Sequence, residues 1–253
     1  MFPPAVSMRN RLDKLLFERG LVPSRERAQA LILAGRVLVN QQKVEKPGAS
    51  VDEDVLLRVL GEEQRYVSRG GFKLEAALDR WHIDLTGRHC ADIGTSTGGF
   101  TDCMLQHGAT GVVAVDTGYG QIAESLRRDP RVSLRERTNA RYLKPGELGP
   151  DISFVSMDVS FISATLVLPG VLGAVRESGE RRVEAVILVK PQFEAGREHV
   201  GKGGIVSNPA AHQLAVDRVR AAVHDLGAAG SEVTESPIQG AKGNREFLLY
   251  SRF

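Results

Sequence analysis

The chain has 253 residues, of which 42% are apolar and 25% are charged, so a packed globular core is expected and global disorder is excluded. Its two cysteines, Cys90 and Cys103, exclude a disulfide framework and lack the spacing of metal ligands. No apolar run is long enough to span a membrane, and residues 1–11 lack the apolar segment of a signal peptide. We therefore expect a cytoplasmic protein that uses no metal.

Positive charge gathers near the amino terminus, although the net charge of the chain is only +2. Residues 9–36 contain seven basic and three acidic side chains, a local charge of +4, so the remaining residues together carry −2. This asymmetry indicates an anionic partner for the first segment. Solvated helix surfaces are the alternative explanation of the same charges.

The first 60 residues predict a small α+β module. Helices are expected at residues 11–20 and 25–34, where leucines and other apolar residues recur on one face and a glycine ends each pattern. Ser24 is the expected N-cap of the second helix. Short strands are expected at residues 36–39 and 55–59, and the polar residues 61–65 indicate a linker.

From Gly71 onward, helices alternate with apolar strands. We expect helices at residues 73–81, 100–107, 122–128, 163–175 and 209–226, and strands at 89–93, 111–115, 132–136, 152–157, 185–189, 232–238 and 246–253. This alternation predicts an α/β fold with a mainly parallel sheet that helices cover on both faces. Ligands bind such sheets outside the carboxyl ends of the strands.

A glycine-rich segment, residues 91–100 (ADIGTSTGGF), follows one strand and opens a helix. Its G-x-x-x-G-G spacing argues against a dinucleotide pyrophosphate site. Asp92 suits a ligand with a cationic end, and Asp116, at the end of the next strand, can accept hydrogen bonds from both hydroxyls of a ribose. The alternative is an ordinary glycine turn with Asp116 as a surface acid.

Four ionisable residues stand at the ends of predicted elements: Lys73, Asp158, Lys190 and Glu246. An antiparallel last strand would bring its start, with Glu246, to the edge where the parallel strands end. Lys190 closes a very apolar strand, where packing alone gives little reason for a lysine. For any one of these residues, a solvated or snorkelling charge is the alternative.

Together these residues resemble a known family. Residues 92–100 with Lys73, Asp158, Lys190 and Glu246 look like the FtsJ-type ribose 2′-O-methyltransferases, whose K-D-K-E tetrad the four positions match one by one. Residues 11–16, 24–25 and 35–40 resemble an S4 RNA-binding domain. The order of the two modules, with the segments 65–71 and 190–194, is similar to the TlyA (haemolysin A) family.

The resemblance implies a Rossmann-like, seven-stranded, mostly parallel methyltransferase sheet with an antiparallel last strand, and a small amino-terminal α+β S4 domain. The implied division is an S4-like domain at residues 8–62, a linker at 63–70 and a methyltransferase domain at 71–253. The implied cofactor is S-adenosylmethionine, bound by Asp92, Gly94, Thr95, Ser96, Gly98, Gly99, Phe100, Asp116 and, at the adenine edge, Asn139. Relatives commonly have aspartate at position 139, so Asn139 departs from the pattern.

The implied partner is ribosomal RNA or a ribosomal subunit. The candidate RNA-binding residues are basic residues of the first module: Arg11, Lys14, Arg25, Arg27 and Arg36. Residues 194–207, rich in glycine, are long for a strand–helix connection and indicate a lid or an RNA-contacting flap. Neither the composition nor the motifs bear on the oligomeric state.

The tetrad suggests a mechanism for methyl transfer. A ribose hydroxyl is a weak nucleophile, so its proton must pass to a base, and an amine can be that base only when it is partly neutral. A neighbouring ammonium and partial burial both favour the neutral amine. We therefore expect Lys190 to be the base with Lys73 close by, and Asp158 and Glu246 to orient the two lysines.

Three other interpretations stay open from the sequence. The protein could be an RNA-binding ribosome-assembly protein with a vestigial methyltransferase domain. It could be a membrane-active haemolysin, which the lack of an apolar span disfavours. It could also be another nucleotide-dependent enzyme with the same architecture.

Overall fold

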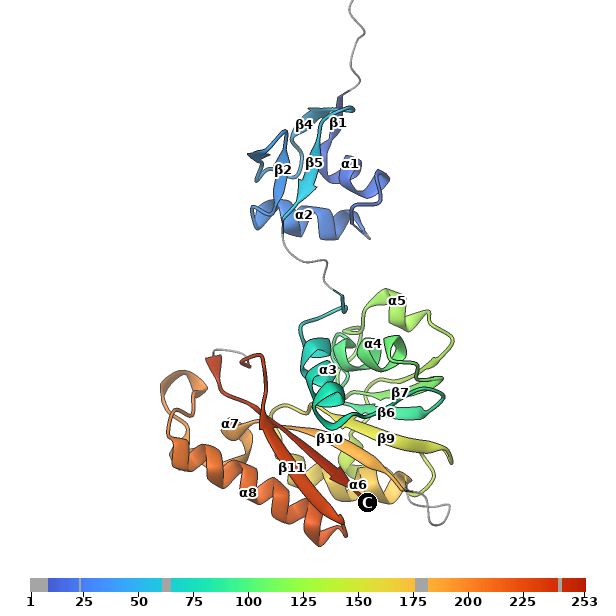
Figure 1. Ribbon diagram of the computed structural model, residues 1–253, viewed down its shortest axis with the longest axis vertical. Helices are drawn as coiled ribbons and strands as arrows, with labels where there is room; N and C mark the ends of the chain where they lie inside the picture. Colours follow the sequence, from blue (N-terminus) through green and yellow to red (C-terminus); the bar gives the residue numbers. More distant parts are fainter. Residues whose placement is uncertain (1–8, 23, 61–64, 176–181, 241–242) are drawn as a thin grey trace, which may run out of the picture. The chain divides into compact units, whose positions relative to one another are not determined.

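The computed structural model of the chain describes residues 9–22, 24–60, 65–175, 182–240 and 243–253. Residue 8 of the predicted first domain and residues 61–64, which include most of the predicted polar linker, lie outside this part. Contacts divide the chain into two units, Met1–Arg65 and Tyr66–Phe253 (Figure 1).

The first unit is a small α+β structure. Its elements are β1 (Arg9–Arg11), α1 (Leu12–Glu18), α2 (Arg25–Leu33), β2 (Val37–Val39), β3 (Gln42–Lys43), β4 (Ser50–Asp52) and β5 (Leu57–Val59). Strand β1 pairs with β4, and the other strands form an antiparallel sheet in the order β3-β2-β5. Ser24 Oγ accepts a hydrogen bond from Arg27 N and so caps α2 as predicted. Leu12, Leu16 and Ile32 are fully buried at the centre of this unit.

The second unit has the predicted α/β architecture. Its main helices are α3 (Gly70–Trp81), α4 (Gly99–Gln106), α5 (Glu124–Arg127), α6 (Ala164–Val175), α7 (Pro191–Glu194) and α8 (Pro209–Asp225). Its strands are β6 (His89–Ile93), β7 (Gly111–Val115), β8 (Val132–Arg135), β9 (Ile152–Met157), β10 (Glu184–Val189), β11 (Gly230–Glu235) and β12 (Phe247–Arg252). In the described residues these strands form one seven-stranded sheet in the order β11-β12-β10-β9-β6-β7-β8.

Strand β12 is antiparallel to both of its neighbours, whereas β6, β7, β8, β9 and β10 pair in parallel. The mostly parallel sheet with an antiparallel last strand is therefore confirmed. Phe247, the first residue of β12, pairs with Val189, the last residue of β10. This register brings the start of β12 to the edge at which the parallel strands end.

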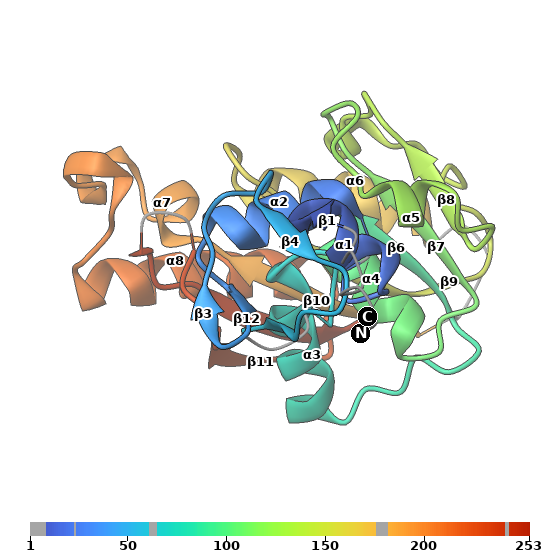
Figure 2. The same ribbon diagram turned by 90° about the horizontal axis from the view of Figure 1, so that it is seen from above.

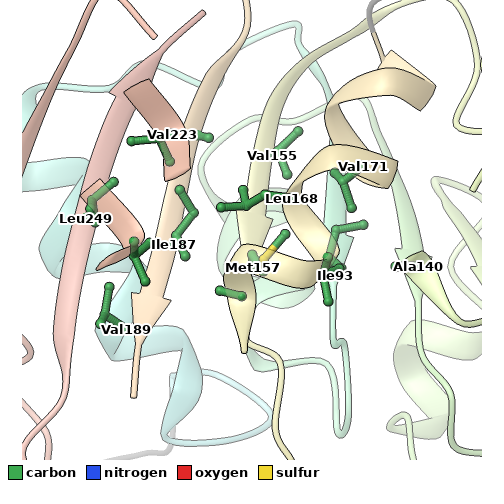
Figure 3. Close-up of a cluster of buried hydrophobic side chains, with 14 of the residues drawn as sticks. Ile93, Ala140, Val155, Met157, Leu168, Val171, Ile187, Val189, Val223 and Leu249 are labelled. Atoms are coloured by element: carbon green, nitrogen blue, oxygen red, sulfur yellow. The ribbon is translucent and has the colours of Figure 1, made fainter. Parts of the chain in front are cut away.

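Helices cover both faces of the sheet (Figures 1 and 2). Alternate strand residues such as Met157 and Ile187 pack with Leu168 of α6 and Val223 of α8 (Figure 3). The residues between them, such as Phe154, pack on the opposite face with α3 and α4. Strands buried on both faces read as continuous apolar runs, which is why their positions could be predicted closely.

Helix α3 begins at Gly70, three residues before the predicted start. Gly71 lies against the ring of Tyr66, where a Cβ atom would come within 2.2 Å of the ring. Tyr66 is 1% exposed and belongs to the core of the second unit. The prediction placed Gly70 in the linker, but α3 begins there, and Gly71 allows its first turn to lie in close contact with Tyr66.

Candidate active site

The four ionisable residues of the predicted tetrad form two short ion pairs. Lys73 Nζ, in the first turn of α3, lies 2.6 Å from Glu246 Oε2, in the residue before β12. Lys190 Nζ, in the residue after β10, lies 2.6 Å from Asp158 Oδ1, in the residue after β9. The topology thus pairs residues that are distant in sequence, as the strand order predicts.

Three of the four side chains are largely removed from water, and the fourth, Asp158, is half-buried. The exposed fractions of Lys73, Lys190 and Glu246 are 9%, 8% and 3%. Burying a charge is costly unless an opposite charge or hydrogen bonds compensate it, so each lysine and its carboxylate depend on one another. Lys73, Asp158 and Lys190 line a cavity of about 330 Å³, together with residues of the glycine-rich loop and Ile238, Gln239 and Gly240.

Lys190 has a further partner that the sequence did not indicate. Its Nζ donates a hydrogen bond to Ser160 Oγ at 2.7 Å. Ser160 is exposed and lies two residues after Asp158. A serine outside any motif gives no sequence signal of this kind; only its position close to Asp158 on the same strand end could have indicated it.

The glycine-rich loop passes very close to neighbouring segments. Gly94 has φ +87°, and a Cβ atom there would lie 2.5 Å from the carbonyl oxygen of Asp158. A Cβ atom at Gly99 would lie 2.3 Å from Ser68 Oγ. The loop therefore needs glycine at both positions to pack beside the Asp158 and Ser68 segments.

A second cavity, of about 480 Å³, adjoins the first and shares Gly94, Ser96, Asp158 and Ser160 with it. Its wall also includes Asp116 after β7 and Asn139 after β8. Asp116 accepts hydrogen bonds from Ser96 N at 2.7 Å and Gly118 N at 2.6 Å, which fixes its carboxylate between two loops.

The predicted cofactor residues differ in their placement. Thr95, Gly99 and Phe100 line the first cavity, Asp116 and Asn139 line the second, and Gly94 and Ser96 line both. Gly98 lines neither cavity; it packs against Leu126, which a Cβ atom at Gly98 would approach to 2.3 Å. Asn139 Oδ1 accepts from Arg141 N and caps the turn Ala140–Tyr142, so its oxygen has a structural role as well.

Asp92 lies beneath the loop and lines neither cavity. It is fully buried, and it accepts hydrogen bonds from Thr101 Oγ1 at 2.6 Å and Ser156 Oγ at 3.1 Å. Burial raises the pKa of Asp92 to about 7, with a smaller contribution from the charge of Asp158, while the two hydroxyl groups oppose the rise. The structure therefore places Asp92 where it joins β6, β9 and α4.

Two of the candidate RNA-binding residues, Arg11 and Arg25, share a carboxylate that the sequence did not indicate. Asp13 is fully buried and accepts hydrogen bonds from Arg11 Nε at 3.0 Å, Arg25 Nη2 at 3.3 Å and Gln29 Nε2 at 2.8 Å. The Arg11 guanidinium holds the pKa of the Asp13 carboxyl well below its usual range, against the effect of burial. Lys14 instead pairs with Glu18 at 3.3 Å.

The segment predicted as a lid or flap is anchored at both ends. Glu194 accepts hydrogen bonds from Ser163 Oγ at 2.5 Å and Ala164 N at 2.7 Å. Asn244 accepts from Val206 N at 3.0 Å and donates to the carbonyl oxygen of Gly204 at 2.8 Å. These bonds connect the segment to α6 and to the residues before β12, so its role as a flap stays a prediction.

Among the residues that the structure describes, no group of three or more histidine, cysteine, aspartate or glutamate side chains could hold a metal ion. No helix within the same residues is long and apolar enough to cross a membrane.

Comparison with known proteins first defines the fold class. Residues 66–253 match the family described as FtsJ-like methyltransferase, and residues 10–56 match the S4 domain. A solved S-adenosylmethionine dependent methyltransferase from Mesorhizobium loti has a TM-score of 0.51 and 15% identity, over 70% of this chain and 96% of that one. The second unit therefore has the α/β methyltransferase fold.

Two relatives then define the family. The 16S/23S rRNA (cytidine-2′-O)-methyltransferase TlyA of Mycobacterium tuberculosis is 44% identical over 98% of this chain and 91% of its own length. A solved Streptococcus thermophilus protein, provisionally classed as a hemolysin, is 43% identical with a TM-score of 0.72, over 96% of this chain and 88% of that one. The chain belongs to the TlyA family of FtsJ-like methyltransferases that carry an S4 domain, as the sequence motifs predicted.

Proposed function

We propose that this enzyme transfers the methyl group of S-adenosylmethionine to the 2′-hydroxyl of a ribose in ribosomal RNA. The observation that carries the proposal is the pair of buried lysine–carboxylate contacts beside a cavity that adjoins a second, nucleoside-sized one. The named activity of the M. tuberculosis relative, 2′-O-methylation of rRNA cytidine, agrees with it.

The second cavity fits the nucleoside part of the cofactor. Asp116 keeps acceptor capacity on both oxygens for ribose hydroxyls, because each oxygen accepts only one of the loop hydrogen bonds described above. Asn139 would offer its side-chain NH₂ group to the adenine, since its oxygen caps a turn. Gly94, Thr95, Ser96 and Gly99 would hold the methionine end, with Gly98, Phe100 and the buried Asp92 supporting their loop. The bound cofactor would supply a methyl group on a positively charged sulfur.

The first cavity provides the groups for proton transfer. Lys190, after its ammonium has released a proton to solvent, would accept the 2′-hydroxyl proton as the 2′-oxygen attacks the methyl carbon. Asp158 balances the charge that Lys190 gains. Lys73 and Glu246 form a second neutral pair, which limits the total charge of the site and helps to hold the ribose in place.

The first unit would hold the RNA substrate. The S4 match at residues 10–56 and the local excess of positive charge support this role for Arg11, Lys14, Arg25, Arg27 and Arg36. We keep residues 8–62 as the proposed RNA-binding domain, 63–70 as the linker and 71–253 as the methyltransferase domain, with Tyr66 of the proposed linker packed in the core of the second unit. Phosphate contacts of this kind orient the enzyme without selecting a sequence.

Two of the competing interpretations are weakened. The interpretation as a vestigial domain does not explain why Lys73 and Lys190 are both buried beside one cavity, where their desolvation is costly. A haemolysin that crosses the membrane through a helix gains no support from the described residues.

The test is transfer of a labelled methyl group from S-adenosylmethionine to purified small and large ribosomal subunits and to protein-free rRNA. We expect label in RNA, and hydrolysis of the modified nucleotide should locate it on a ribose 2′-oxygen. Label on a base would exclude the proposed acceptor. No label in any RNA, with RNA binding demonstrated, would favour the assembly-protein interpretation.

A further inference from the structure

The two oxygen partners of Lys190 differ in kind. Asp158 Oδ1 lies 2.6 Å from Nζ, yet among the described residues this buried oxygen has no partner with hydrogen-bond geometry. Ser160 Oγ, by contrast, accepts a hydrogen bond from Nζ at 2.7 Å. Asp158 therefore supplies the opposite charge, and Ser160 supplies the directional contact.

The orientation of the Lys190 amine matters for proton transfer. A lysine side chain has a flexible four-carbon stem, so an ion pair alone does not fix how its terminal nitrogen is turned. A neutral amine that accepts a proton must turn its single lone pair toward the substrate hydroxyl. A hydrogen bond from one N–H to a fixed acceptor restricts that rotation and leaves the lone pair to face another direction.

The segment that carries Ser160 is fixed where it leaves β9. Asp158 N donates to the carbonyl oxygen of Ile93 at 2.8 Å, which fixes the start of the segment on β6. Phe161, the next residue, has φ +65°, a left-handed conformation that a bulky side chain rarely adopts. Ser160 lines both cavities, so the segment after β9 brings its hydroxyl group to the place where the two cavities adjoin.

We propose that Ser160 is a positioning residue that orients Lys190 Nζ for removal of the 2′-hydroxyl proton. This inference rests on the proposed function. Lys190 Nζ takes the proton as the 2′-oxygen bonds to the methyl carbon, and the carbon–sulfur bond breaks with its electron pair left on sulfur. Throughout, one N–H of Lys190 stays hydrogen-bonded to Ser160 Oγ, and the ammonium that forms stays paired with Asp158.

The test compares Ser160→Ala with Ser160→Thr, which keeps the hydroxyl group. Thr165→Ala, which removes a hydroxyl at the start of α6 without touching Lys190, is the matched control. For Ser160→Ala we expect kcat to fall about tenfold or more, because the amine is misaligned, with KM for cofactor and RNA within about twofold of wild type. Ser160→Thr should recover most of kcat, and Thr165→Ala should retain it.

Wild-type kcat in Ser160→Ala would overturn the inference. So would equal losses in the Ala and Thr variants, or a loss of cofactor affinity that accounts for the defect, because Ser160 would then shape the cofactor cavity instead. A second measurement does not depend on turnover: the side-chain ¹⁵N resonance of Lys190, assigned with Lys190→Arg. It should broaden in Ser160→Ala and persist in Ser160→Thr, and an unchanged resonance in Ser160→Ala would contradict the inference even if wild type methylated no RNA.

Discussion

Lys73 and Glu246 show how a buried pair couples stability to function at the scale of single residues. Glu246 is 3% exposed, and its carboxylate has Lys73 Nζ at 2.6 Å. Removing one member of such a pair leaves the other charge buried without compensation, whereas removing both removes the desolvation cost as well. Stability and activity should therefore respond differently to single and double substitution.

Glu246→Gln should lower the free energy of unfolding by about 3 kcal/mol, because the Lys73 ammonium stays buried without its counter-charge. The double variant Lys73→Met, Glu246→Leu should recover much of that stability while methyl transfer stays impaired. Denaturant unfolding and transfer assays on the same preparations measure both effects. Recovery of activity in the double variant would show that the pair is purely structural.

Asp92 predicts a specific dependence of stability on pH. Its pKa of about 7 in the folded protein exceeds that of an unfolded aspartate, so between about pH 4 and pH 7 the folded state binds more protons. This contribution is fully present at low pH and is lost as the pH rises through 7. From pH 5 to pH 8, wild type should lose roughly 2 kcal/mol more stability than Asp92→Asn. Parallel stability curves for the two proteins would contradict this assignment.

At the scale of elements, β1, α1 and α2 meet at the buried Asp13. Arg11 ends β1 and Arg25 begins α2, and both guanidinium groups contact the same carboxylate. Their side chains are about half exposed, at 55% and 46%, so donors remain available to an anion. Asp13 should thus hold two arginines in one place for RNA phosphate.

Asp13→Asn distinguishes anchoring of the two arginines by Asp13 from a simple effect of net charge on RNA binding. The substitution raises the net charge by one, so long-range attraction alone predicts tighter RNA binding. We expect the reverse, about tenfold weaker binding with a shallower salt dependence, because the arginines lose their common anchor. Glu18→Gln is the control, since it also adds one positive charge and spares Asp13. If both variants bind RNA equally more tightly than wild type, and circular dichroism shows intact folds, the anchoring role of Asp13 is contradicted.

Prediction from sequence succeeded where local pattern decides the structure. The strands at 89–93, 111–115 and 152–157 have the predicted ends, because each is a mainly apolar segment bounded by polar or glycine residues. Strand β1, with the sequence RNR, was missed because its pairing with β4 uses backbone groups and leaves no apolar signature. Helix α7 was missed for a related reason, since four residues are too few to show a period.

The residues of the candidate site also fall into those that the sequence could predict and those that it could not. Lys73, Asp158, Lys190 and Glu246 could be identified because the strand order fixes where their element ends meet. Ser160 and Asp13 could not, because their importance lies in a hydrogen bond to one particular side chain across the fold. The sequence also indicated Asp92 as a ligand contact, whereas burial beneath the loop depends on how β6, β9 and α4 pack.

At the scale of the whole molecule, the two proposed functions, RNA binding and methyl transfer, belong to different units. The first concentrates positive charge and matches the S4 domain, and the second carries the tetrad and both cavities. Loss of RNA binding and loss of chemistry should therefore be separable by substitution. Variants of Asp13 should change the affinity for RNA, and variants of Lys190 should change the rate of transfer from RNA that is already bound.

The most direct measurement is the single-turnover rate of methyl transfer to rRNA by Lys190→Ala, with cofactor and enzyme saturating. The exposed Lys144→Ala is the matched control. We predict a rate at least about a hundredfold below wild type in Lys190→Ala, with RNA and cofactor affinities retained, and a wild-type rate in Lys144→Ala. Transfer by Lys190→Ala at the wild-type rate would contradict the account, because the base would then lie elsewhere.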